Sequence, residues 1–107
     1  MGLIIKCNHK NYHLTYSEFD FIKNQLSKSI VDYININFEI NNIVNLKKII
    51  NGIHIFIINN HFTPNESSNF IKSIIIIHKF INFTENMYKL CNLFMYSIKS
   101  NNIITIN

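Results

Sequence analysis

The chain has 107 residues, 48% hydrophobic and 15% charged, with a mean hydropathy of +0.10. This balance excludes an intrinsically disordered chain, and the length suits one domain with a core of its own. The net charge is +4, but all 10 cations are lysines scattered along the chain, and there is no arginine to fork onto phosphate. A solvated lysine surface is therefore favoured over a nucleic-acid-binding patch.

Residue usage is biased: Ile, Asn, Lys, Phe and Tyr dominate, while Ala, Arg and Trp are absent. The abundant residues share A/T-rich codons, so we expect an AT-rich genome such as that of a large DNA virus, a protozoan or an endosymbiont. The opening MGLIIK lacks the charged segment and long apolar run of a signal peptide, and the two cysteines lie far apart. We therefore expect reduced thiols and a cytoplasmic or nuclear protein, in a host cell if the source is viral.

The first third of the chain predicts a hairpin, a helix and a strand. Residues 3–8 and 11–15 are extended patterns on either side of a polar turn, which is typical of a β-hairpin. Ser17 is the predicted N-cap of a helix with acids in its first turn. That helix has one apolar stripe, made of Phe19, Ile22, Leu26, Ile30 and Tyr33. From Ile34 to Ile40 apolar and polar residues alternate, which predicts a half-buried strand.

The middle of the chain predicts a second helix. Asn41-Asn42 supply its caps, Lys47-Lys48 point outward, and Gly52 weakens or ends it. The predicted inward residues are Ile43, Leu46, Ile49, Ile50 and Ile53. The stretch from Ile53 to Phe62 is interpreted as a helix end followed by a short strand or loop.

A run of four isoleucines, Ile74 to Ile77, favours a strand by propensity alone. It follows Thr63-Pro64-Asn65-Glu66, which is a capping box with proline at the first helical position, so we predict a helix through the run. Lysines and a histidine interrupt the segment well short of the roughly 20 apolar residues of a membrane span. Four successive isoleucines surround most of a helix, so we expect this helix near the domain centre or partly against a partner.

Thr84-Glu85 caps a final helix, and the short link at Asn82-Phe83 makes the two helices antiparallel neighbours. The predicted apolar face of the final helix comprises Met87, Leu90, Cys91, Phe94, Met95 and Ile98. Residues 1–100 are predicted to form one domain, and residues 101–107 a flexible C-terminal tail. The predicted fold class is α+β: a small sheet with a cluster of helices, ending in an antiparallel helical hairpin.

This order of elements resembles the BTB/POZ fold, in particular its short adaptor branch with elongin C and the Skp-type subunits of cullin ubiquitin ligases. The stretch LIIKCNHKNYHLT resembles the opening strand pair, and INFEINNIVNLKKII resembles the mid-domain strand and helix. The closing helical hairpin is matched by FIKSIIIIHKFINFTENMYKLCNLFMYSI. The extra C-terminal helices with which Skp-type adaptors hold F-box proteins have no counterpart here.

The resemblance implies a protein–protein interaction domain that acts as an adaptor, or as a viral mimic of one, between a cullin-type scaffold and a substrate receptor. The scaffold-facing surface of the family then corresponds to Phe56, Asn60, His61 and Phe62, together with Tyr88. Tyr96, like Tyr88, lies off the centre of the apolar stripe and is a candidate interface aromatic. Two alternatives stay open: a homo-oligomerising BTB domain without a ligase role, and a small basic nucleic-acid-binding protein.

Catalytic and metal chemistry has few candidates. Cys7, His9 and His13 share the predicted hairpin, with His13 across from Cys7, but they offer at most three metal ligands. Cys91 falls on the apolar stripe, where burial raises the pKa of a thiol and favours packing over nucleophilic attack with His78 as base. Neither glycine, Gly2 or Gly52, belongs to a phosphate-binding loop. We expect no enzymatic activity, no cofactor, no metal and no membrane association.

Overall fold

The computed structural model of the chain describes residues 2–36 and 43–107. The chain opens with strands β1 (Gly2–Cys7) and β2 (Lys10–Thr15), followed by the long helix α1 (Tyr16–Ile36). A helical segment comes next, formed by α2 (Ile43–Ile49), the π-helical turn η2 (Ile50–His54) and α3 (Ile55–Ile58). The closing part comprises β3 (His61–Phe62), α4 (Pro64–Ile77), the 3-10 turn η3 (His78–Phe80), α5 (Glu85–Ser100) and β4 (Ile104–Ile106).

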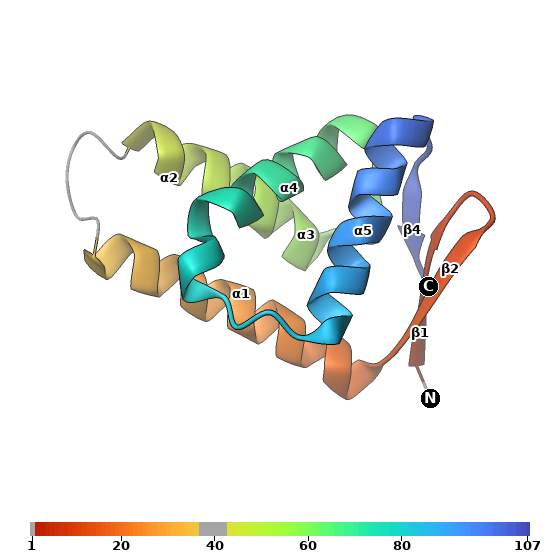
Figure 1. The fold of residues 1–107 in the computed structure, drawn as a ribbon, viewed down its shortest axis with the longest axis horizontal. Coiled ribbons are helices and arrows are strands. Elements are labelled where there is room, and N and C mark those ends of the chain that lie inside the picture. Colours follow the sequence, from red (N-terminus) through yellow and green to blue (C-terminus); the bar gives the residue numbers. More distant parts are fainter. Residues whose placement is uncertain (1, 37–42) are drawn as a thin grey trace.

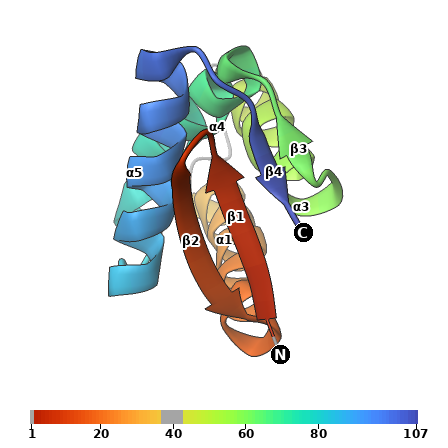
Figure 2. The ribbon, with the colours of Figure 1, turned by 90° about the vertical axis from the view of Figure 1, so that its right-hand side faces the viewer.

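The strands form one antiparallel sheet in the order β2-β1-β4-β3. The sheet lies at one end of the molecule, and the helices gather on one of its faces (Figures 1 and 2). Side chains alternate accordingly: Ile5 and Cys7 are buried, whereas Ile4 and Lys6 are exposed on the opposite face. The predicted hairpin is confirmed, and the structure is the expected small α+β domain.

The prediction of a flexible tail at residues 101–107 is wrong. Strand β4 lies between β1 and β3, and its residues Ile104 and Ile106 are buried. Asn101 ends α5 with a left-handed φ of 57°, a conformation that asparagine tolerates, and so turns the chain back toward the sheet. Asn107 extends the pairing through two backbone hydrogen bonds with Ile4, of 2.9 and 3.0 Å. The fold therefore ends in a strand and not in the helical hairpin.

Helix α1 begins earlier and ends later than predicted. Its capping box uses Thr15 and not Ser17: the Thr15 hydroxyl accepts from the Glu18 amide at 3.1 Å, and the Glu18 carboxylate accepts from the Thr15 amide at 2.8 Å. The predicted strand is wrong over residues 34–36, because α1 continues to Ile36. The rest of that strand, residues 37–40, and the caps at 41 and 42 lie outside the described residues.

The C-terminal part of α1 packs against the neighbouring turn η3. Tyr33 is buried near its C-terminal end and meets the Phe80 ring edge-on, with centroids 6.1 Å apart. Burial of one aromatic side chain outweighs the weak helix propensity of the surrounding β-branched residues. The predicted stripe otherwise holds, except that Ile30 is only half-buried.

The middle helix does not end at Gly52, because the chain continues through η2 into α3. Ile49 and Ile53 are buried as predicted, but Ile50 is 46% exposed. Gly52 marks a close approach of α4: an added Cβ would lie 2.4 Å from the carbonyl oxygen of Asn69. Glycine at this position therefore allows two helical backbones to pack tightly.

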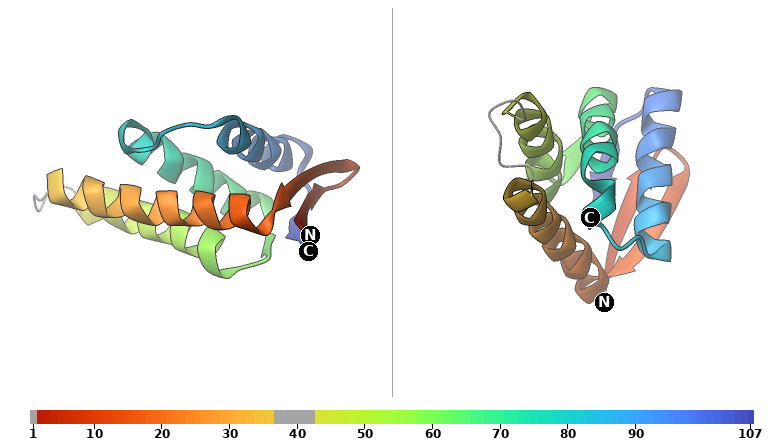
Figure 3. Two further views of the ribbon diagram at one scale, coloured as in Figure 1. Left: turned by 90° about the horizontal axis from the view of Figure 1, so that it is seen from below. Right: turned by 60° about the vertical axis from the view of Figure 1, so that its left-hand side comes forward.

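The capping box of α4 is confirmed. The Thr63 hydroxyl accepts from the Glu66 amide at 3.2 Å, and the Glu66 carboxylate accepts from the Thr63 amide at 2.9 Å. Helix α4 runs through the isoleucines and packs against α5, α2, η2, α1 and β3, which is the expected central position (Figures 1 and 3). The core around it contains four fully buried phenylalanine rings in contact with one another, from Phe56, Phe62, Phe70 and Phe94.

Helices α4 and α5 are antiparallel neighbours. The start of α4 lies beside the end of α5, where the buried Ser67 hydroxyl donates to the Ser97 hydroxyl at 3.1 Å. The link between them is longer than predicted and includes η3. Both helices bury the same five-position pattern: Ser67, Phe70, Ser73, Ile74 and Ile77 in α4, and Met87, Leu90, Leu93, Phe94 and Ser97 in α5. No helix within residues 2–36 and 43–107 is both long and apolar enough to span a membrane.

Candidate protein-interaction surface

The structure separates the six predicted contact residues into different places. Phe56 and Phe62 are each 1% exposed. Their rings stack at a centroid distance of 5.9 Å inside the aromatic core, so neither reaches the surface of the folded chain. The prediction that they face a scaffold is wrong, because the segment from Phe56 to Phe62 supplies core packing as well as a turn.

Asn60 and His61 are exposed at the edge of the sheet, where the Asn60 carbonyl accepts from the Ile106 amide at 2.7 Å. Tyr96 is half-buried against the hairpin: it meets His9 edge-on at 6.0 Å, and the Lys10 ammonium lies 4.2 Å from its ring centroid. Asn60, His61 and Tyr96 therefore lie at the sheet end of the molecule. Tyr88 lies on a different side of α5, where its ring contacts Phe83.

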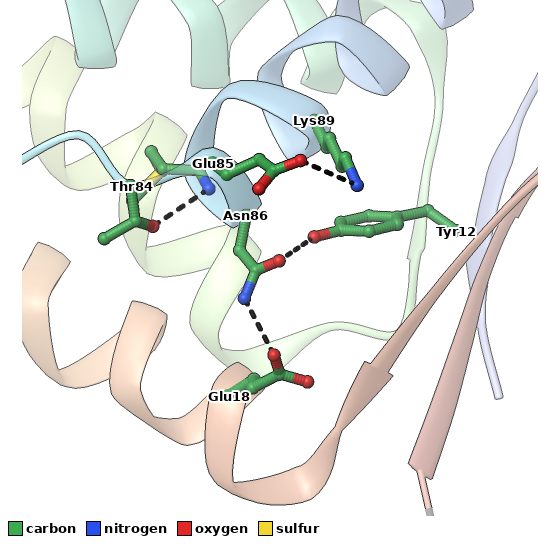
Figure 4. Close-up of polar contacts among 7 residues, drawn as sticks. Tyr12, Glu18, Thr84, Glu85, Asn86 and Lys89 are labelled. Atoms are coloured by element: carbon green, nitrogen blue, oxygen red, sulfur yellow. Dashed lines mark hydrogen bonds and ion pairs between the residues drawn. The ribbon is translucent and has the colours of Figure 1, made fainter.

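Polar contacts fix the start of α5 against the hairpin and α1 (Figure 4). Asn86 accepts from the Tyr12 hydroxyl of β2 and donates to the Glu18 carboxylate of α1 at 3.0 Å. The hydrogen bonds from Thr15 and Asn86 lower the pKa of Glu18, so the carboxylate stays charged at neutral pH. Burial, followed by the nearby carboxylates, raises the pKa of Tyr12, which remains a neutral hydroxyl donor. This network determines which side of α5 faces the sheet.

The opposite side of α5 carries an apolar stripe. Tyr88, Met95 and Ile98 are 59%, 55% and 40% exposed, and half-buried Cys91 lies between them. Their spacing of three and four residues places them on one helical face. Tyr88 also stacks on Phe83, with ring centroids 5.1 Å apart, which holds the aromatic side chain at the end of the stripe.

Helix α4 contributes a second, parallel line of apolar residues. One flank of α4 faces α2 and η2, because the Ser73 hydroxyl lies 2.8 Å from the Lys48 carbonyl oxygen. Ile71 and Ile75 lie on the other flank, toward α5, since residues two positions apart on a helix are about 200° apart. Ile75 is 64% exposed and Ile71 is half-buried. Figure 3 shows α4 running between α2 and α5, so these two flanks are distinct.

We call the two lines together the α4–α5 surface. It consists of Ile71, Ile75, Tyr88, Cys91, Met95 and Ile98. Burial raises the pKa of Cys91 to about 11, so its thiol is protonated and acts as a small apolar side chain, as predicted. The charged residues beside the surface are lysines, Lys72 on α4 and Lys99 on α5, and both are exposed. The only acids of the two helices are Glu66 and Glu85, in the first turns.

The residues weighed for metal and catalytic chemistry do not converge. Cys7 points into the core, and burial raises the pKa of its thiol. His13 pairs with Ile4 and not with Cys7, and both His9 and His13 are exposed, with His9 against the Tyr96 ring of α5. Within the described part of the chain, no group of three or more His, Cys, Asp or Glu side chains could hold a metal ion.

Sequence reasoning identified Tyr88 but missed most of the α4–α5 surface. Met95 and Ile98 were assigned to the core, whereas Leu93 and Ser97 are buried in their place. A signal was present: α5 has apolar residues around more than half of its circumference, more than one packing face requires. Which side would be covered depends on β2 and α4, which the helix sequence does not specify.

The chain was compared with protein-family models, with curated proteins and with solved structures, and none of the three comparisons gave a match.

Proposed function

We propose that this chain is a protein-interaction domain that binds a protein partner through the α4–α5 surface. The observation that carries the proposal is the exposure of Ile75 on α4 and of Tyr88 and Met95 on α5, two helices that pack against each other. Soluble domains rarely leave contiguous apolar area uncovered unless something binds it, and aromatic and methionine side chains are enriched where proteins meet. The two neighbouring helices also offer a rigid platform that does not need to fold on binding.

The charged residues beside the α4–α5 surface indicate which charges a complementary partner would carry. Lys72 and Lys99 flank the apolar lines, and no acid lies beyond the first turns of α4 and α5. A complementary partner therefore presents an apolar centre with acidic residues at its rim. A helix with apolar residues at three- and four-residue spacing is the simplest shape that covers two parallel helical lines.

The BTB/POZ adaptor type is our proposal for the class of domain. It is supported by the opening hairpin, the long first helix and the antiparallel pair α4 and α5. Strand β4, inserted between β1 and β3, is an addition to the pattern that suggested the family. Under this proposal the partner is a cullin-type scaffold or a substrate receptor, and a viral origin would make the chain a mimic of the cellular adaptor.

A pull-down from cell lysate with a double variant tests the proposal. Ile75→Ser with Met95→Ser removes two exposed contacts, so folding should be unchanged while partner recovery falls at least about tenfold. Phe21→Ser on α1 is the matched control, because Phe21 is 58% exposed but lies on another helix. Equal partner recovery by all three proteins would contradict the assignment of this surface. If a control adaptor recovers a cullin and this chain does not, the ubiquitin-ligase role is wrong.

Self-association is the second candidate, because the same apolar surface could pair with that of another copy. Light scattering over a range of concentrations separates the two. A dimer that dissociates in the Ile75→Ser, Met95→Ser variant would assign the surface to a second copy, whereas a monomer at every concentration removes this alternative. The nucleic-acid alternative requires binding that weakens steeply with salt, and it is removed if no shift occurs at low salt.

A further inference from the structure

The flank of α4 that faces away from α5 carries a cleft of a different character. Its lining residues are Lys48, Asn51, Asn69 and Lys72, and its volume is about 220 Å³. Lys48 and Asn51 come from α2 and η2, whereas Asn69 and Lys72 come from α4. Two positive charges and two carboxamides therefore converge from two helical segments on one concavity.

The walls of this cleft are held by close packing beneath it. The Ser73 hydroxyl lies 2.8 Å from the carbonyl oxygens of both Lys48 and Asn69. Gly52 allows the approach, because an added Cβ would lie 2.0 Å from the Ser73 hydroxyl oxygen. Asn51 projects from the π-helical turn η2, a rare geometry that occurs frequently at functional sites.

Within residues 2–36 and 43–107, no carboxylate pairs with the two lysines of the cleft. Among the described residues the ion pairs are Lys23–Asp20 and Lys89–Glu85, and neither Lys48 nor Lys72 takes part in one. The described residues that line the cleft include no carboxylate. Lysine ammonium groups bind phosphate as point charges, and asparagine amides add directed N–H donors.

We propose that this cleft binds a phosphate monoester group. Such a group carries about −1.5 to −2 charges at pH 7, which balances two lysines better than a single carboxylate does. The volume of about 220 Å³ compares with roughly 30 Å³ for one water, so the cleft holds the phosphate and part of the molecule that carries it. The site goes beyond the protein-interaction proposal and rests on different residues: Lys48, Asn51 and Asn69 belong to neither the α4–α5 surface nor its rim, and only Lys72 borders both.

The test is a titration of the full chain followed by NMR, with inorganic phosphate, adenosine 5′-monophosphate and a phosphoserine peptide as probes. We expect chemical-shift changes concentrated at Lys48, Asn51, Asn69 and Lys72. Stronger binding of the peptide assigns the phosphate to a protein, and stronger binding of the nucleotide assigns it to a small molecule. Equally tight binding of acetate would overturn the choice of phosphate.

Two variants and a control distinguish phosphate binding in this cleft from nonspecific attraction of phosphate to a basic protein. Lys48→Gln and Lys72→Gln should each weaken phosphate binding about tenfold, the factor expected for loss of one charge-assisted contact. Lys28→Gln, at an exposed position of α1, lowers the net charge by the same amount and should leave the affinity for phosphate unchanged. An equal loss in all three variants, or shift changes elsewhere on the surface, would overturn the proposal. Partner recovery in the pull-down is a separate readout, so the two proposals can fail independently.

Discussion

Two isoleucine-rich stretches of this chain adopt different structures: Ile74 to Ile77 in α4, and Ile103 to Ile106, which leads into and forms β4. The first is helical, and its exposure follows the helical period: Ile74 and Ile77 are buried, while Ile75 is 64% exposed. The second is extended, and its exposure alternates, with Ile103 53% exposed and Ile104 buried. The same residue type therefore serves as core or surface according to the period of its element and not its own propensity.

What differs between the two stretches is the source of the structural information. The helix is specified locally by the capping box at Thr63 and Glu66, ahead of the isoleucines. The strand β4 is specified by partners far away in sequence, β1 on one side and β3 on the other. Local signals override β-propensity in the first case, and distant pairing creates a strand in the second.

The largest expected change in the free energy of unfolding comes from replacing a buried isoleucine of α4, with an exposed isoleucine of the same helix as the control. Ile77→Ala removes a fully buried side chain and should lower the free energy of unfolding by about 2–5 kcal/mol. Ile75→Ala, on the same helix, should change it by less than about 0.5 kcal/mol. Urea unfolding of both variants measures the difference, and similar losses would break the assignment of Ile75 to the surface.

The same contrast applies to the strand. Ile104→Ala should also cost about 2–5 kcal/mol, because Ile104 is fully buried, while its neighbour Ile103 should tolerate alanine. A flexible tail would make the two variants equivalent. Chemical denaturation therefore distinguishes a central strand from a loose terminus, and hydrogen exchange of the Ile106 amide, which donates to the Asn60 carbonyl, gives independent evidence.

A smaller effect is expected where α4 meets η2. Gly52→Ala places a methyl group 2.4 Å from a backbone oxygen of α4, which cannot move aside as a side chain can, so we expect a loss of about 1–3 kcal/mol. Asn92→Ala on the exposed face of α5 serves as the control, since alanine there improves helix propensity. A stabilised Gly52→Ala protein would show that the two helices are further apart than described.

The smallest expected effect depends on pH and concerns the contact that orients α5. Because the pKa of Glu18 is lowered in the folded chain, its carboxylate stabilises the fold above the unfolded pKa of about 4.3, and this contribution disappears as pH falls through the folded value. Glu18→Gln should therefore be less stable than the wild-type chain at pH 7 and equal to it in acid. Thermal unfolding at both pH values checks this, and a difference that persists in acid would point to lost packing.

Much of the fold could be predicted from residues that act locally. The hairpin, α4 and α5 follow from alternation, from capping and from proline placement. The N-cap of α1 is Thr15 and not the predicted Ser17, and the pattern before Phe62 leaves strand and loop equally open. What could not be predicted depends on contacts between distant segments: pairing with β1 on one side and with β3 on the other creates β4. The same reason explains why Phe56 and Phe62 were assigned to a partner when they pack in the core, and why Met95 and Ile98 were assigned to the core when they are exposed.

The position of β4 also has a consequence for synthesis on the ribosome. Strand β4 is synthesised after β1 and β3 and lies between them, so the sheet has a high contact order. Until residue 106 leaves the exit tunnel, Ile5 and Phe62 lack the central strand that separates and covers them. We expect ribosome-bound chains to gain protease resistance only when β4 has emerged, and earlier resistance would show that the helices can form a stable core without it.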